Sequence, residues 1–201
     1  QFQELNFLST EQRAKSVSVT LAASQHMFST LAKFRAIRIL WPRILAECGL
    51  PDAPLALHGD TSRLMMASVD AYSNILRSVA AVFGAGLGGA DSICVLPFSA
   101  MQGVPNAFAR RVSRNLQAML LHEAHLWRVN DVGAGAGTIE KLTQQLCNDA
   151  MYVMENARQG DWPFGNIELS PVLPVIGVSE FQDAQSQQHE IEGALHEVVS
   201  S

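Results

Sequence analysis

The sequence contains few cysteines and shows no pairing pattern among them. Cys48, Cys94 and Cys147 are odd in number, lie far apart and have apolar neighbours. This spacing favours buried, reduced thiols over disulfides or a zinc site. Reduced thiols in turn predict a cytoplasmic protein.

Positive charge and long hydrophobic runs are scarce as well. Lys and Arg number 14 against 19 Asp and Glu, so the formal net charge is -5. No basic run offsets this balance, and nucleic acid is therefore not a predicted partner. No apolar run reaches the ~18 residues of a membrane span, and the N-terminus lacks a charged-then-apolar signal pattern. We expect no membrane partner.

Apolar segments that favour strands alternate with longer segments of helical periodicity. The predicted strands are SVSVTLAAS at 16–24, APLALHGDTS at 53–62, SICVLPFSA at 92–100, and a weaker one that starts at Trp127. The predicted helices cover 26–48, 72–84, 107–125 and 139–158. Pro42 should kink or divide the first helix, and Gly49 should close it. The glycines at 84–91 predict a turn. The apolar residues predicted to face inward from the third helix are Phe108, Val112, Leu116, Met119, Leu120 and Leu121.

This alternation predicts an α/β fold with a parallel sheet. The strands start roughly 35 to 40 residues apart, which is the spacing of a βα repeat. Four units alone would leave two open sheet edges, so we expect half of an eight-unit barrel, a partial TIM barrel. The predicted divisions are a polar lead at 1–15, the half barrel at 16–160, and a Pro/Gly-rich C-terminal arm with the start of a linker at 161–201. A short amphipathic helix is expected over 190–199.

Polar residues cluster where each predicted strand ends, which is where ligands bind in α/β folds. Among them His58 is the candidate catalytic residue, because a neutral imidazole can polarise a substrate carbonyl. The alternative is a histidine held by Asp60 or Thr61 without any chemistry. Asp60 itself would disfavour an incoming phosphate or carboxylate.

Two other patterns do not carry the chemistry that they suggest at first. The run His122-Glu123-Ala124-His125 lacks the four-residue spacing of a zincin, so no metal site is predicted. The run at 133–137 alternates glycine and alanine without the fixed positions of a nucleotide-binding loop, and it predicts a flexible turn.

Three blocks of the sequence resemble the coenzyme-B12-dependent acyl-CoA mutases, the family of methylmalonyl-CoA mutase. These blocks are LAKFRAIRILWPRILAECG at 31–49, GGADSICVLPFSAMQGVPNAFARRVSRNLQAMLLHEAH at 88–125 and VIGVSEF at 175–181. The resemblance implies a TIM barrel that threads the CoA thioester through its axis, and a separate domain that holds cobalamin. The four predicted units resemble the C-terminal half of that barrel.

Departures from the family pattern point to the small, non-catalytic subunit. Where catalytic chains have Arg-Ala-His-x-Gln-Thr-Ser, the stretch at 56–62 keeps only His58, Thr61 and Ser62, which the resemblance assigns to substrate binding. The third strand ends in Leu96-Pro97-Phe98 rather than His-Thr-Asn-x-Phe, as in the small subunit.

The resemblance also assigns residues to the cofactor. Asn115, Gln117 and Glu123 match family positions, with Glu123 as a contact to a ribose hydroxyl. The Asp-x-His-x-x-Gly signature, whose histidine ligates cobalt, is absent from the chain. The resemblance therefore implies adenosylcobalamin in the complete enzyme and none bound by this chain alone.

The combined interpretation is a barrel portion of a methylmalonyl-CoA mutase-like isomerase, structural and inactive alone. The expected partner is another barrel half or a mutase large subunit. Two alternatives stay open: a fragment of a catalytic mutase chain, and a homodimeric half-barrel that binds an acyl-CoA without converting it.

Overall fold

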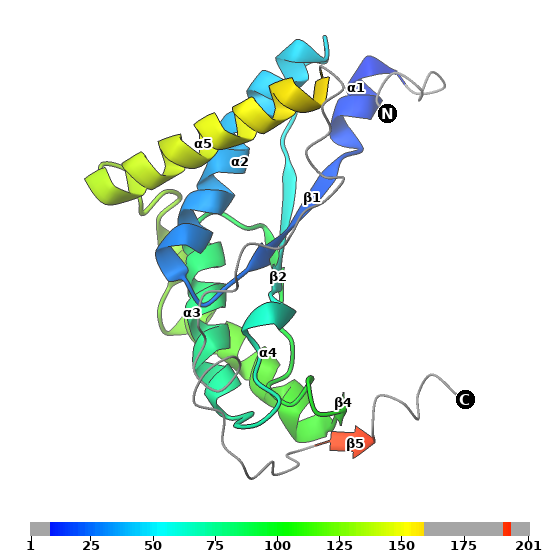
Figure 1. Ribbon diagram of the computed structural model, residues 1–201, viewed down its shortest axis with the longest axis vertical. Helices are drawn as coiled ribbons and strands as arrows, with labels where there is room; N and C mark the ends of the chain where they lie inside the picture. The colour runs from blue at the N-terminus through cyan, green and yellow to red at the C-terminus, as the bar shows by residue number, and fades with distance from the viewer. Residues whose placement is uncertain (1–8, 159–190, 194–201) are drawn as a thin grey trace.

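The computed structural model describes residues 9–158 and 191–193 as a mixed α/β structure (Figure 1). The helices are α1 (Thr10–Lys15), α2 (Met27–Glu47), α3 (Ser73–Leu87), α4 (Ala107–His122) and α5 (Gly137–Arg158), with 3-10 turns η1 (Arg63–Met65) and η2 (Leu126–Arg128). The strands are β1 (Ser18–Ala23), β2 (Ala56–Thr61), β3 (Ser92–Cys94), β4 (Val104–Pro105) and β5 (Ile191–Gly193).

The first three strands form one parallel sheet in the order β1-β2-β3. Each of them is followed by a long helix, which confirms the predicted α/β class and the alternation of strand and helix. Parallel pairing places the carboxyl ends of all three strands at the same end of the sheet. Within the described residues, β1 and β3 each pair on one side only.

The predicted fourth strand is wrong. The chain from Leu126 to Arg128 forms η2, and α5 follows it through a turn. Trp127 and Val129 are 67% and 58% exposed, so a strand here would gain no burial. Leu126 instead packs against α3, beside Gly86 and Val82. Three strand–helix units followed by α5 therefore replace the four units expected.

Several predicted boundaries also shift. Helix α2 continues through Pro42 without dividing, and Gly49 follows it with a φ of 65°, the left-handed value expected after a helix end. Helix α3 extends to Leu87 through glycines that were expected to turn the chain. The glycines instead permit close packing, because a Cβ at Gly88 would lie 2.6 Å from the Cβ of Phe34. Only Ser92–Cys94 of the third predicted strand is extended.

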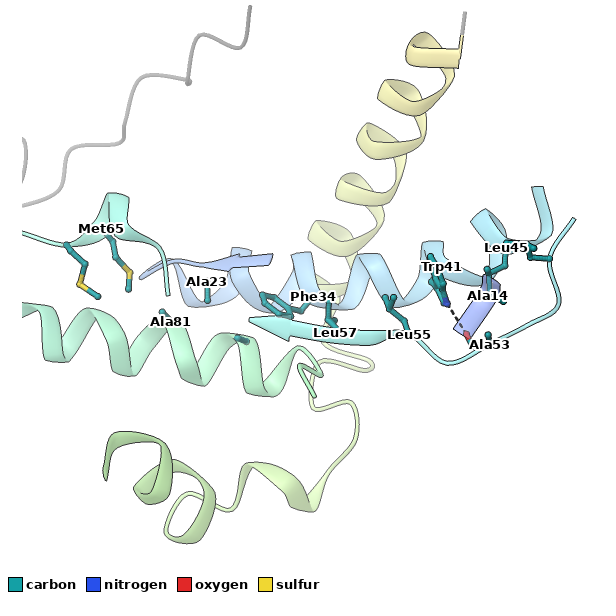
Figure 2. Close-up of a cluster of buried hydrophobic side chains, with 13 residues drawn as sticks. Ala14, Ala23, Phe34, Trp41, Leu45, Ala53, Leu55, Leu57, Met65 and Ala81 are labelled. Carbon is teal, nitrogen blue, oxygen red and sulfur yellow. Dashed lines mark hydrogen bonds between the residues drawn. The ribbon is translucent and has the colours of Figure 1, made fainter. Parts of the chain in front are cut away.

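The main core lies between the sheet and α2 and α3 (Figure 2). Phe34 and Leu57 are almost completely buried in it, and Ala14 of α1 packs near Leu45 at the end of the sheet where β1 starts. The indole Nε1 of Trp41 donates a hydrogen bond to the backbone oxygen of Ala53 over 2.8 Å. This bond satisfies both buried polar groups and ties α2 to the chain that enters β2.

Burial differs from the prediction on α4 and at two cysteines. Phe108, Met119 and Leu121 are 40% to 48% exposed, because α4 contacts the rest of the described chain along a narrow stripe that includes Leu116 and Leu120. The three cysteines are free thiols, as expected. Only Cys147 is buried, whereas Cys48 and Cys94 are exposed.

The two ends of the sequence are described only in part. In the expected polar lead at 1–15, α1 begins with a capping box between Ser9 and Gln12. The C-terminal arm at 161–201 lies outside the described residues except for β5, which pairs antiparallel with β4. This strand contradicts a helix over the whole of 190–199.

Candidate functional site

The two faces of the parallel sheet differ in character. Leu57, Gly59 and Thr61 of β2 are buried on the face that packs against the helices. Side chains of alternate residues point to the opposite face, which remains partly or fully exposed. We call this second surface the open face; it carries Ser18, Thr20, Ala22, Ala56, His58, Asp60, Ser92 and Cys94. Its side chains are small or polar, so it differs from a dry core.

His58 lies in the middle of the open face, between partners on two strands. Its Nδ1 lies 2.6 Å from Oγ of Ser92 and its Nε2 lies 3.1 Å from Oδ1 of Asp60. The register explains both contacts, because His58 is paired with Ser92 across the ladder and Asp60 follows it by two residues on the same face. The histidine is thus held by Asp60, as one of the two expectations had it, and also by Ser92.

Ser92 was missed by sequence reasoning. The apolar pattern predicted strands that contain His58 and Ser92. The pairing of these two residues, however, depends on a strand register that no local pattern specifies. Cys94 lies two residues further along the same face, opposite Asp60. Although Cys94 is exposed, partial desolvation of its thiol raises the pKa, and the negative charge of Asp60 adds to that effect.

Thr61 and Ser62 serve the backbone. The hydroxyl of Thr61 is buried and accepts a hydrogen bond from the amide of Leu96 over 2.8 Å, which fixes the chain leaving β3 onto the end of β2. The hydroxyl of Ser62 accepts from the amide of Leu64 and caps η1. Thr61 lies on the face opposite His58, and the hydroxyl of Ser62 is engaged by η1, so their predicted contact with substrate stays a prediction.

The three residues assigned to the cofactor lie on α4 and do not converge. Asn115 and Glu123 line a surface cleft of about 550 Å³ between α3 and α4, together with Val79 and Met119. Gln117 lines a different hollow, of about 460 Å³, beside Trp127 and β3. Their binding roles remain predictions, and within the described residues these side chains do not share one cavity.

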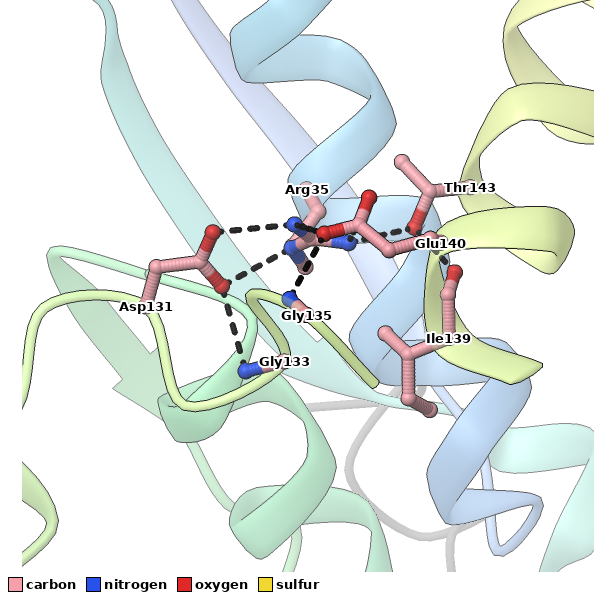
Figure 3. Close-up of polar contacts among 7 residues, drawn as sticks. All are labelled: Arg35, Asp131, Gly133, Gly135, Ile139, Glu140 and Thr143. Carbon is pink, nitrogen blue, oxygen red and sulfur yellow. Dashed lines mark hydrogen bonds and ion pairs between the residues drawn. The ribbon is translucent and has the colours of Figure 1, made fainter. Parts of the chain in front are cut away.

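A buried arginine holds the glycine-rich turn against α2 and α5 (Figure 3). Arg35 is 9% exposed, and its guanidinium contacts Asp131 at 2.9 Å and Glu140 at 3.1 Å. It also donates to the hydroxyl of Thr143, which itself donates to the backbone oxygen of Ile139. We call these four side chains, Arg35, Asp131, Glu140 and Thr143, the Arg35 cluster.

The carboxylates of the Arg35 cluster also order the turn itself. Asp131 accepts from the amide of Gly133 over 3.2 Å, and Glu140 accepts from the amide of Gly135 over 3.1 Å. The hydrogen bond from Arg35, followed by that from Gly135, holds the pKa of Glu140 below its usual value. The hydrogen bond to Asp131 is the main cause that raises the pKa of Arg35. The run at 133–137 is therefore a turn, as expected, with specific hydrogen bonds to the Arg35 cluster.

Lys33 lies at the carboxyl end of β1, where it donates to the backbone oxygen of Ala22. It lines a hollow of about 240 Å³ with residues of α5 that include Gln145 and Asp149. Burial lowers the pKa of its ammonium group. Sequence reasoning gave Lys33 and Arg35 no role, because charged residues at helical spacing usually mark a solvated face.

Two further properties concern only the part of the chain that the structure describes. No group of three or more His, Cys, Asp or Glu side chains there could hold a metal ion. Nor does any helix there combine the length and the hydrophobicity needed to cross a bilayer.

These features define an α/β protein whose parallel strands present a polar face that no described helix covers. Residues 5–161 match the family described as methylmalonyl-CoA mutase. Because that match covers well over half of the sequence, the chain belongs to the methylmalonyl-CoA mutase family. The family expected from the three sequence blocks is thus confirmed.

Individual relatives support the resemblance to small subunits. The chain is 40% identical over 155 residues to a methylmalonyl-CoA mutase small subunit of Streptomyces virginiae, covering 77% of this chain and 25% of that protein. It is 42% identical over 142 residues to a probable methylmalonyl-CoA mutase small subunit of Mycobacterium tuberculosis, and the match covers 68% of this chain and 23% of that protein. A methylmalonyl-CoA mutase small subunit of Porphyromonas gingivalis is 33% identical over 180 residues, and the match covers 88% of this chain and 29% of that protein. The chain thus spans about a quarter of the length of these relatives.

Adenosylcobalamin, which the family implies, does not fit the described residues as a resident cofactor. Asn115 and Glu123 line one hollow and Gln117 lines another, so neither of these two hollows gathers the whole set of residues assigned to the cofactor. His58 is held between Ser92 and Asp60 on the open face, and no motif for a cobalt-ligating histidine occurs in the sequence. No chemical step is therefore assigned to cobalamin on these residues.

Proposed function

We propose that this chain forms part of the barrel wall of a small-subunit-like methylmalonyl-CoA mutase and has no mutase activity alone. The complete enzyme would catalyse an adenosylcobalamin-dependent rearrangement of an acyl-CoA. A large subunit or another barrel half would pair with the open edges of β1 and β3. The open face would then line the interior of the closed barrel.

The observation that carries this proposal is the open face, together with two sheet edges that pair with no other strand among the described residues. An isolated parallel sheet is normally covered by helices on both faces, or closed into a barrel whose interior it lines. Here α2 and α3 pack on one face, while Thr20, His58 and Ser92 on the other face remain accessible. Small polar side chains can contact a polar ligand such as an acyl-CoA, whereas a second layer of helices would need apolar side chains to pack against.

Turnover measurements test the proposed inactivity. The purified chain is incubated with adenosylcobalamin and methylmalonyl-CoA, and succinyl-CoA is followed by liquid chromatography. We expect no product above the protein-free control. Turnover by the chain alone would overturn the proposal.

The barrel-wall role has its own test in two matched alanine variants. Ala22 is exposed on the open face of β1, and Ala107 is exposed at the start of α4. In the complex with a mutase large subunit, Ala22→Trp should weaken association or acyl-CoA binding, because the indole would occupy the barrel interior. Ala107→Trp should leave both unchanged. Equal behaviour of the two variants would contradict an interior position for the open face.

A further inference from the structure

Ser92, His58 and Asp60 form a continuous hydrogen-bonded chain on the open face. The distances are 2.6 Å from Ser92 Oγ to His58 Nδ1 and 3.1 Å from His58 Nε2 to Asp60 Oδ1. Both lie within the range at which a base accepts a proton from a nucleophile and is oriented by a third group. The side chains of His58 and Asp60 are 36% and 53% exposed, so a ligand can reach them.

The protonation pattern follows from the chemistry of the three groups. An ionised carboxylate only accepts hydrogen bonds, so the neutral imidazole carries its proton on Nε2, facing Asp60. The lone pair of Nδ1 then accepts the hydroxyl proton of Ser92. The direction of these hydrogen bonds is that of a serine nucleophile with its base. In chymotrypsin-type triads Nε2 faces the serine and Nδ1 faces the aspartate, whereas here Nδ1 faces Ser92 and Nε2 faces Asp60.

We propose that Ser92 is an activated nucleophile that accepts an acyl group from a thioester or an activated ester. Oγ forms a bond to the acyl carbon while its proton passes to Nδ1 of His58. The carbon–sulfur or carbon–oxygen bond of the donor breaks, and the proton on His58 goes to the departing thiolate or alkoxide. Water then hydrolyses the acyl-serine by the same base, which releases the free acid and restores the serine.

The charge of Asp60 limits the class of acyl group. The carboxylate of Asp60 lies 3.1 Å from Nε2 of His58 and gives the open face a negative charge, which repels a second carboxylate that approaches Ser92. An uncharged acyl group, such as acetyl or propionyl, is therefore preferred over a dicarboxylic one. The choice of a CoA thioester as the natural donor rests on the proposed function, whereas the reactivity of Ser92 does not.

The test uses the 201-residue chain and a fluorophosphonate probe, which bonds covalently to activated serines. Peptide mass spectrometry locates the label, and p-nitrophenyl acetate gives the rate of acylation. We expect the label on Ser92 and none in Ser92→Ala. His58→Gln should lower the labelling rate on the order of 100-fold, the usual contribution of a general base. Ser18→Ala, an exposed serine on the same face of β1, is the matched control and should react like the parent chain.

Asp60 is a positioning residue in this scheme, and a conservative variant separates that role from a structural one. Asp60→Asn should slow labelling about 10-fold or more, because the amide favours the wrong tautomer of His58. Asp60→Glu should restore part of the rate. Circular dichroism melts of every variant should match those of the parent chain, since all three side chains are accessible.

Two results would overturn the inference. One is the absence of label on Ser92, whether or not another residue is labelled, and the other is a labelling rate that His58→Gln does not change. Neither of these depends on a mutase partner or on cobalamin. Failure of the barrel-wall proposal would leave the labelling of Ser92 intact, so the two failures can be told apart.

Discussion

Arg35 and Asp131 form a two-point ion pair, with Nε–Oδ1 and Nη2–Oδ2 distances of 2.9 Å each. The two residues lie 96 positions apart in the sequence. Their pairing joins the middle of α2 to the glycine-rich turn between η2 and α5. The turn that leads into α5 is thus positioned by charge as well as by apolar packing.

Arg35→Ala should lower the free energy of unfolding by about 3 kcal/mol. The guanidinium is nearly buried, and its loss removes a hydrogen-bond donor from Thr143 and the positive charge that pairs with Asp131 and Glu140. Urea denaturation measures the change. Arg43→Ala, at an exposed position on the same helix, should shift stability by no more than about 0.5 kcal/mol. Similar losses for the two variants would show that the Arg35 cluster adds nothing specific.

Stability should fall on acidification through the titration of Glu140. Its pKa in the folded chain lies below the reference value of 4.5, so the unfolded chain binds the proton more readily. The stabilisation is therefore present above pH 4.5 and is lost as the pH falls through the lower folded pKa. Urea denaturation at a series of pH values measures the slope, and Glu140→Gln should flatten it. The slope of Glu140→Gln must be compared with that of the parent chain, because Glu11, beside Lys15, also has a lowered pKa and contributes to both slopes. An unchanged slope in Glu140→Gln would contradict the ion pair.

Trp41→Phe should destabilise the chain by about 2 kcal/mol. The substitution removes the indole donor and leaves the backbone oxygen of Ala53 buried without its partner. Thermal unfolding followed by circular dichroism measures the loss. Trp127→Phe changes a residue that is 67% exposed, and its melting temperature should stay close to that of the parent chain. If Trp127→Phe cost as much as Trp41→Phe, the buried hydrogen bond would not be the cause.

The three cysteines should react with iodoacetamide in a fixed order. Cys48 is exposed and should react first, whereas burial both shields Cys147 and raises its pKa, so it should react only after unfolding. Cys94 is exposed, but its raised pKa should slow it. Asp60→Asn should accelerate Cys94 at pH 8, because the negative charge that opposes thiolate formation is gone. Mass spectrometry of the tryptic peptides measures each rate, and rapid modification of native Cys147 would contradict its burial.

The structure separates several of the residues that the sequence grouped into one site, for reasons that lie beyond local sequence. Thr61 and Ser62 follow His58 closely in the chain, yet strand alternation and the end of β2 turn their hydroxyls to backbone partners. Asn115 and Gln117 are two residues apart on a helix, which places them on different sides of it. Ser92 joins His58 only through the pairing of β2 with β3.

The sequence by itself determined the alternation of strands and long helices, the end of α2 before Gly49 and the family to which the chain belongs. The alternation follows from local hydrophobic periodicity, and the helix end follows from a glycine that adopts the left-handed conformation. The family follows from three blocks of sequence that resemble its members. Tertiary structure decided that Trp127 starts no strand, that Arg35 is buried and that Ser92 meets His58. Each of these outcomes depends on contacts between residues distant in the chain, whose energies no local pattern contains.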